Sequence, residues 1–165
     1  MFWGSFFLRI MEHTDKEFMQ MAIGLAAKNL DRKNGGPFGA VVVKNGTLIA
    51  KSENLVKANV DATAHAEIMA IRLASKKLNT VDLSDCVLYT SCEPCPMCMA
   101  AIYWANITKV YFASSSSDAL KAGFDDQIIL KELSKPIENR NLPMEEIMRD
   151  EANQVFMSWV KEGND

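Results

Sequence analysis

Residues 86–104 read CVLYTSCEPCPMCMAAIYW and decide the central part of the fold. The short apolar run from Cys86 to Thr90 predicts a buried strand. A tight turn then leads to Pro94, and proline suits the first turn of a helix. We expect this helix to run to about Trp104. The segment is therefore predicted to form a strand, a turn and a helix in direct succession.

Similar patterns extend in both directions along the chain. Thr14–Glu17 has the form of a capping box and predicts a helix to about Leu30. Two apolar runs flank Asn45-Gly46, a dipeptide that favours a β-hairpin. Further patterns predict a helix over residues 64–78 with core positions Ile68, Ile71, Leu73 and Ala74, a strand over residues 110–113 and a helix over residues 144–161. Strands that alternate with helices after a hairpin predict an α/β fold with helices on both faces of the sheet.

The size and charge of the chain narrow its class. Its 165 residues suit one domain with a sizeable core. The formal net charge is −3 and no block of five like charges occurs, which disfavours a polyanion-binding tail. Four cysteines, three of them between Cys92 and Cys98, are too few and too unevenly spaced for a disulfide scaffold. Cysteines this close together suggest a metal site instead.

The apolar N-terminal segment MFWGSFFLRI raises the question of a targeting sequence. It is shorter than the roughly 20 residues of a membrane-spanning helix, and it lacks a leading basic region and a small-residue cleavage site. We expect a soluble, cytoplasmic protein without membrane partners. We further expect residues 1–11 to be a disordered extension and residues 12–165 to form a single domain.

Three side chains have the chemistry and spacing of metal ligands. His65 opens one predicted helix, and Cys95 and Cys98 open another. Cysteines at i and i+3 share a helix face, and a helix N-terminus favours the thiolate form that a metal needs. One imidazole and two thiolates suit zinc and leave the fourth coordination position open. Water held in an open position of this kind loses a proton near pH 7, which indicates a catalytic site.

Glu67 is the candidate catalytic residue. Residues two apart on a regular helix point in nearly opposite directions, but in a first turn His65 and Glu67 can still converge over the helix end. The alternative role is an N-terminal capping carboxylate. A capping box would place the acid three residues after the cap, whereas Thr63 and Glu67 are four apart. We therefore expect Glu67 to move protons between the water and the substrate.

Two other interpretations of the cysteines agree less well with the sequence. Cys92, Cys95 and Cys98 have the spacing that starts an iron–sulfur motif, but its fourth ligand would fall at Ile102. A thioredoxin-like redox pair would leave the histidine motif unused. Cys86 and Cys92 are expected to be small buried hydrophobic residues.

The motif His65-Ala66-Glu67 followed by Pro94-Cys95-Pro96-Met97-Cys98 has the H-x-E and P-C-x-x-C form of zinc deaminases that act on bases. Taken with its flanking segments, the chain resembles the bacterial guanine deaminases of the cytidine-deaminase-like superfamily over roughly residues 12–160. The segments that carry the resemblance are Gly35–Ala40, Thr63–Glu67, Ser91–Cys98, Ala101–Ala105 and Ala122–Asp126.

The resemblance implies a three-layer α/β/α sandwich with a central mixed sheet. It implies zinc bound by His65, Cys95 and Cys98, with Glu67 as the proton shuttle. The implied reaction is hydrolysis of a purine base, guanine to xanthine and ammonia. It also implies a homodimer in which the C-terminal segment is exchanged between the two copies.

By matched position, Asn54 would hydrogen-bond the purine and Asp126 would accept hydrogen bonds from its N–H groups. Phe38 and Trp104 would form an apolar slot for the ring, and Ala66 is placed with these substrate-binding residues. From the residues alone, Asn54 could equally be a turn residue, Phe38 and Trp104 core residues, and Asp126 a loop cap.

The sequence departs from the guanine deaminase pattern at its C-terminus. Relatives commonly end in a tyrosine that covers the base, whereas this chain ends Glu162-Gly163-Asn164-Asp165; Ala62 also replaces a usual proline. Guanosine, another aminopurine or a pyrimidine therefore stays open as substrate. A tRNA adenosine deaminase shares the zinc motif, but the net acidic chain lacks the basic stripe expected for nucleic acid. A non-catalytic domain stabilised by zinc is the third alternative.

Overall fold

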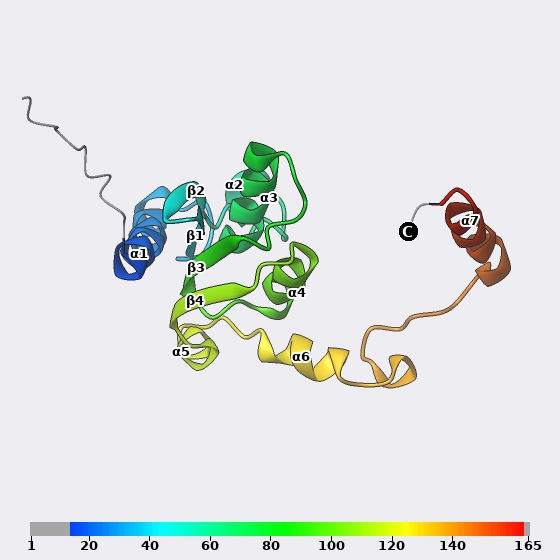
Figure 1. Ribbon diagram of the computed structural model, residues 1–165. Coiled ribbons are helices and arrows are strands. Elements are labelled where there is room, and N and C mark those ends of the chain that lie inside the picture. Colours follow the sequence, from blue (N-terminus) through cyan, green and yellow to red (C-terminus); the bar gives the residue numbers. More distant parts are fainter. Residues whose placement is uncertain (1–13, 164–165) are drawn as a thin grey trace, which may run out of the picture. The chain divides into compact units, whose positions relative to one another are not determined.

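The computed structural model describes residues 14–163, so the expected extension over residues 1–11 lies outside the described part of the chain. The chain divides into two compact units (Figure 1). The first ends at Asp126 and holds the sheet. The second begins at Gln127 and is helical.

The first unit is built on a four-stranded mixed sheet in the order β2-β1-β3-β4 (Figure 1). Its strands are β1 (Gly39–Lys44), β2 (Thr47–Glu53), β3 (Cys86–Cys92) and β4 (Lys109–Ser114). β1 pairs antiparallel with both β2 and β3, while β3 and β4 are parallel. The predicted hairpin at Asn45-Gly46 is confirmed, because both residues have the positive φ that a two-residue turn needs.

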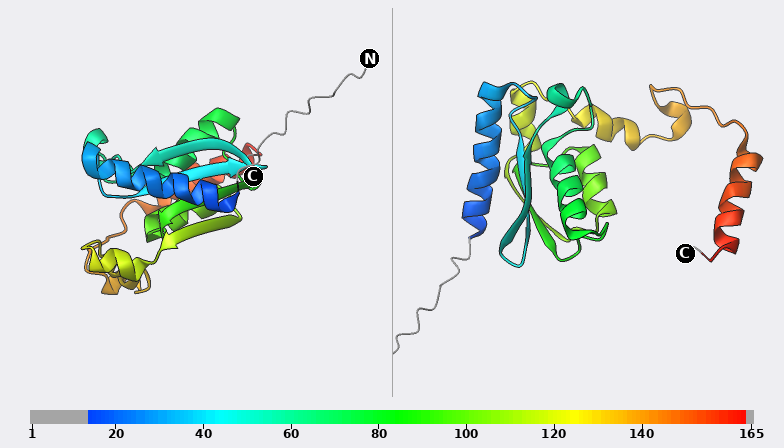
Figure 2. Two further views of the ribbon diagram at one scale, coloured as in Figure 1. Left: turned by 90° about the vertical axis from the view of Figure 1, so that its left-hand side faces the viewer. Right: turned by 90° about the horizontal axis from the view of Figure 1, so that it is seen from above.

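Helices cover both faces of this sheet, which confirms the three-layer sandwich (Figure 2). On one face, α1 (Asp15–Arg32) packs through Phe18 and Ala22 against Val41. On the other face, α3 (Ala66–Leu78) and α4 (Pro96–Trp104) pack against the sheet through a separate cluster that includes Val42. Alternate residues of β1 point to opposite faces, so both faces of this strand are buried. This explains its unbroken run of valines.

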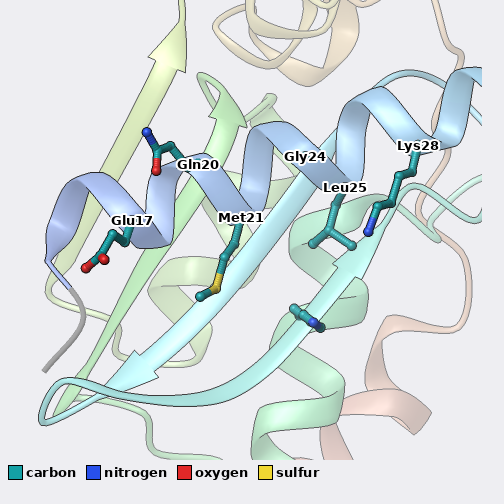
Figure 3. Close-up of a pocket in the computed structure, with 7 residues that line it drawn as sticks. Glu17, Gln20, Met21, Gly24, Leu25 and Lys28 are labelled. Atoms are coloured by element: carbon teal, nitrogen blue, oxygen red, sulfur yellow. The ribbon is translucent and has the colours of Figure 1, made fainter. Parts of the chain in front are cut away.

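An open groove lies between α1 and β2 (Figure 3). It is lined by Glu17, Gln20, Met21, Gly24, Leu25, Lys28 and Lys51. The groove lies on the α1 side of the sheet, whereas the predicted metal ligands belong to the starts of α3 and α4. It is therefore separate from the candidate active site.

Several boundaries and positions differ from the sequence predictions. The proline in the first turn of α4 is Pro96, not Pro94, because Cys95 is the residue that caps this helix. Ile68, Ile71 and Ala74 are buried as expected, but Leu73 is 44% exposed because it lies on the solvent side of α3.

Two short helices of the first unit were not predicted. α2 (Val56–Asn59) has a single turn and no side-chain cap, so no local sequence pattern predicts this helix. α5 (Ser116–Lys121) begins at a capping box formed by Ser115 and Asp118, a signal that the sequence does contain.

The second unit contains α6 (Gln127–Leu133), a 3₁₀ turn η1 (Ile137–Asn139) and α7 (Arg149–Lys161). α7 begins five residues later than predicted. All residues from 127 to 163 are exposed or half-exposed, so the described part of this unit has no buried core of its own. None of the helices in the described residues has the length and apolar character needed to span a bilayer.

Candidate metal centre and active site

Two helix N-termini bring the three predicted ligands together. His65 is the N-cap residue of α3, Cys95 is the N-cap residue of α4, and Cys98 lies in the first turn of α4. His65 Nδ1 lies 3.5 Å from Cys95 Sγ and 3.6 Å from Cys98 Sγ. Because β3 ends at Cys92 and α4 begins at Pro96, both cysteines lie just beyond the C-terminal end of an inner strand of the sheet.

This geometry fits a zinc ion. Tetrahedral zinc, with bonds of about 2.0 Å to nitrogen and about 2.3 Å to sulfur, holds such atoms about 3.5 Å apart. All three donor atoms lie within 4.8 Å of one another, and they form the one candidate metal group found among the described residues. The set supplies three protein ligands, as catalytic zinc sites do.

The protonation of the two thiols also favours a cation. A hydrogen bond from Cys98, helped by His65, lowers the pKa of Cys95, so this thiol ionises readily. The same hydrogen bond to Cys95, together with burial, raises the pKa of Cys98. Two neighbouring thiolates therefore need a compensating positive charge. A divalent metal ion provides it and displaces the second proton.

Glu67 lies beside these ligands and is 5% exposed. Its Oε1 accepts a hydrogen bond of 2.9 Å from Thr90 Oγ1, and its Oε2 lies 3.5 Å from Cys98 Sγ. Burial raises the pKa of Glu67, and the hydrogen bond from Thr90 partly opposes that change. The structure therefore places a buried carboxyl group with raised pKa next to the three donors, as an acid–base group requires.

The main chain joins two of the residues that the resemblance assigns to the base. Asn54 is 4% exposed, and its N–H donates a hydrogen bond of 3.0 Å to the carbonyl oxygen of Phe38. The side-chain oxygen of Asn54 accepts a hydrogen bond of 3.2 Å from the N–H of Val56. Ala66 is fully buried between His65 and Glu67.

Asp126 and Phe38 are linked to the same region through Phe124. The rings of Phe38 and Phe124 meet edge to face with centroids 4.8 Å apart. Burial raises the pKa of Asp126, and the negative charge of Cys95 raises it further. Asp126 lies two residues after Phe124, at the end of the first unit.

The structure does not place Trp104 beside the metal ligands. It is the last residue of α4, about 13 Å along the helix from Cys95 at 1.5 Å per residue. Its side chain is 87% exposed. Cys86 and Cys92 are buried, as expected, and neither belongs to the candidate metal group.

Two polar residues beside the site were not singled out from the sequence. Thr90 is fully buried and holds Glu67. Asn29 is 1% exposed and contacts the segments that carry Phe38 and Asn54. Each position carried a signal in the sequence, because Thr90 is a polar residue in an apolar strand and Asn29 falls on the buried face of a helix.

The fold and the site together define a class of protein. A histidine and two cysteines at helix N-termini, with a buried glutamate beside them, form the site of a zinc-dependent hydrolytic deaminase. Residues 12–114 match the family model described as the cytidine and deoxycytidylate deaminase zinc-binding region, and the chain belongs to this family. Zinc is accordingly its metal.

Comparison with individual proteins also identifies relatives that are deaminases. Guanine deaminase from Bacillus subtilis is 49% identical over 142 residues, which are 86% of this chain and 91% of the relative. The crystal structure of that guanine deaminase superposes with a TM-score of 0.87 at 46% identity, covering 90% of this chain and 95% of the other.

Two further relatives are more distant. The tRNA-specific adenosine deaminase of Aquifex aeolicus is 35% identical over 146 residues, or 88% of this chain and 94% of the relative. A structure of NE0047 in complex with 2,6-diaminopurine has a TM-score of 0.63 at 40% identity, covering 66% of this chain and 61% of that one.

Proposed function

We propose that this protein hydrolyses guanine to xanthine and ammonia. The observation that carries the proposal is the likeness to Bacillus subtilis guanine deaminase, which extends over 86% of this chain and includes the intact metal site. The 2,6-diaminopurine bound to a structural relative also supports a purine base as substrate.

Glu67 is the proton-transfer group of the proposed reaction. His65, Cys95 and Cys98 would hold the zinc ion, which would make a bound water molecule acidic near pH 7. The carboxyl group of Glu67 takes a proton from this water and gives it to a ring nitrogen of the base as the water oxygen bonds to C2. Glu67 then takes the proton of the new C2 hydroxyl group and passes it to the amine. The bond between C2 and the amine nitrogen breaks, and ammonia leaves. Thr90 holds Oε1 of Glu67, so that Oε2 faces the ligands during both transfers.

The remaining site residues are proposed to bind the base. Asn54 hydrogen-bonds the purine from a buried position, and the ring of Phe38 packs against the base. Asp126 accepts hydrogen bonds from N–H groups of the purine. Ala66, which stands between His65 and Glu67 in the chain, contacts the purine. Trp104 stays a proposed wall of the apolar slot, although it lies at the far end of α4.

A second candidate substrate is adenosine in tRNA. The relative from Aquifex aeolicus favours it, because the similarity covers 88% of this chain. Binding of a polyanion is normally supported by basic surface, and the formal net charge here is −3. Guanine is therefore the better supported substrate.

Ammonia release tests the proposed function. The zinc-loaded protein is incubated with guanine, guanosine, adenine, cytosine, cytidine and a tRNA that carries adenosine in its anticodon. We expect ammonia from guanine alone, with one xanthine formed for each ammonia. Turnover of another substrate without turnover of guanine would overturn the proposal, and release of inosine-containing tRNA would support the second candidate.

We also propose a homodimer that exchanges its C-terminal segment. In residues 127–163 no side chain is buried, and α7 leaves Phe156, Trp159 and Val160 each 58–69% exposed. Apolar side chains in such numbers are normally covered in the functional assembly. A second copy of the chain is the occupant that we propose.

A cytoplasmic location is proposed on the basis of the cysteines. All four are free in the structure, and Cys95 and Cys98 must stay reduced to bind zinc. Reducing compartments keep thiols in that state.

A further inference from the structure

Asn29 is a polar side chain in an apolar environment. It lies on the face of α1 that also carries Phe18, Ala22 and Ala26, and this face packs against the sheet. Asn29 is 1% exposed. Apolar residues would satisfy the packing of this helix, so the amide needs a separate explanation.

The amide group of Asn29 spans two loops. Its Nδ2 donates a hydrogen bond of 2.7 Å to the carbonyl oxygen of Gly36 and another of 2.9 Å to that of Asn54. Its Oδ1 is buried and has no hydrogen-bond partner among residues 14–163. An unsatisfied buried acceptor costs free energy. Asn29 is therefore better explained by the two carbonyl groups that it holds than by the stability of α1.

The two carbonyl groups belong to the segments that carry the proposed base-binding residues. Gly36 lies two residues before Phe38, and the main chain of Asn54 is hydrogen-bonded to Phe38. The fit is tight, because a Cβ on Gly35 would lie only 2.0 Å from Asn54 Oδ1. A Cβ on Gly36 would press against the Phe38 ring at 2.8 Å. A small displacement of either loop would therefore move both side chains that are proposed to contact the base.

We propose that Asn29 is a positioning residue for substrate recognition: from α1, it fixes the loops of Phe38 and Asn54 in their base-binding positions. The proposal rests on the proposed function, because it assumes that Phe38 and Asn54 contact the base. Within residues 14–163 the side chain of Asn29 hydrogen-bonds Gly36 and Asn54, not the metal ligands or Glu67. Its effect therefore falls on binding of the base and spares proton transfer.

The test compares Asn29→Ala and Asn29→Leu with the wild-type enzyme. Leucine keeps most of the volume and removes the donors, so at least one variant retains the packing of α1. We expect KM for guanine to rise about 10-fold in both variants, which corresponds to the loss of about one hydrogen bond to the base, while kcat and zinc content stay near those of the wild type. Phe18→Leu is the matched control, because it weakens the same buried helix face. It should lower the melting temperature and leave KM unchanged.

A double-mutant cycle with Asn54→Ala separates positioning from a general structural role. If Asn29 acts through Asn54, adding Asn29→Ala to Asn54→Ala should raise KM by much less than the product of the two single effects. Multiplied effects would overturn the proposal. So would an unchanged KM in both Asn29 variants, or failure of both to fold when Phe18→Leu folds.

The cycle also distinguishes this inference from the proposed function. If the wild-type enzyme does not deaminate guanine but deaminates another base, the proposed function is wrong. The same variants are then measured on that other base. The pattern of raised KM with unchanged kcat would uphold the role of Asn29. A wild-type enzyme active on guanine whose Asn29 variants keep a normal KM would refute only the inference.

Discussion

At the scale of single residues, the proposed chemistry depends on Glu67. Glu67→Gln keeps the shape and burial of the side chain but removes its capacity to take a proton. We expect turnover to fall about 10²-fold to 10⁴-fold, the usual range for a positioned acid–base group, while zinc stays bound. Turnover of guanine with parallel metal analysis measures both quantities. Normal turnover in this variant would remove Glu67 from the reaction.

Thr90 affects the same step through its hydrogen bond to Glu67. Thr90→Val is close in shape but leaves Oε1 of Glu67 without this 2.9 Å contact. We expect kcat to fall about 10-fold, which corresponds to the loss of one hydrogen bond to a charged group. Thr90→Ser restores the hydroxyl group and should restore most of kcat. Equal activity of the valine and serine variants would contradict this positioning role.

Cys95 is distinguished from the neighbouring Cys92 by its effect on the metal. Cys95→Ser replaces a thiolate that the site ionises readily by a hydroxyl group that does not ionise. We expect its zinc content after dialysis to fall well below one ion per chain. In the wild type, the sulfur of Cys92 faces the carbonyl oxygen of Ser115. The Cys92→Ser variant should therefore keep its zinc. The opposite result would make Cys92 the ligand.

At the scale of secondary-structure elements, Asp15 joins the start of α1 to two strands. Its carboxylate accepts hydrogen bonds of 2.6 Å from Tyr89 on β3 and 2.9 Å from Tyr111 on β4. The two tyrosine rings are stacked at 5.0 Å, and Lys109 Nζ lies 4.6 Å from the centre of the Tyr111 ring. The hydrogen bond from Tyr89, followed by that from Tyr111, lowers the pKa of Asp15.

This lowered pKa predicts a pH-dependent contribution to stability. In the unfolded chain Asp15 titrates near its ordinary value of 3.8. Because the folded pKa is lower, the contribution is fully present above pH 3.8 and is lost as the pH falls through the folded pKa. Asp15→Asn should therefore melt below the wild type at pH 7 and pH 5, and the difference should shrink near pH 3. Thermal unfolding of both proteins under identical zinc conditions measures it, and a constant difference would contradict the prediction.

At the scale of the whole molecule, the exposed apolar side chains of α7 are the basis for the proposed dimer. Phe156→Glu combined with Trp159→Glu places two charges where we expect a second copy to pack. We predict a shift from dimer to monomer in sedimentation experiments, with loss of activity and retention of zinc. Gln154→Glu is the control, because at 3.6 residues per turn it lies on the opposite side of α7. An unchanged oligomeric state in the double variant would exclude α7 from the interface.

Much of the fold follows from patterns that are local in the chain. The capping box at Thr14, the turn at Asn45-Gly46 and the apolar strand before Cys92 were correctly predicted because each depends on neighbours within a few residues. Leu73 and the helix α2 show the limit of such patterns. Burial of Leu73 depends on which face of α3 meets the sheet, and α2 is a single turn without a capping side chain.

The candidate site, too, was predictable from the sequence only in part. The sequence by itself determined the donor set and its likeness to zinc deaminases, because His65, Cys95 and Cys98 stand at helix starts that local signals mark. Only the tertiary structure decided that Thr90 holds Glu67, that Asn29 holds Asn54, and that Asp15 holds two tyrosines. These partners lie 23 to 96 positions apart in the chain. Hydrogen bonds over such separations depend on how helices pack on the sheet, which no local periodicity specifies.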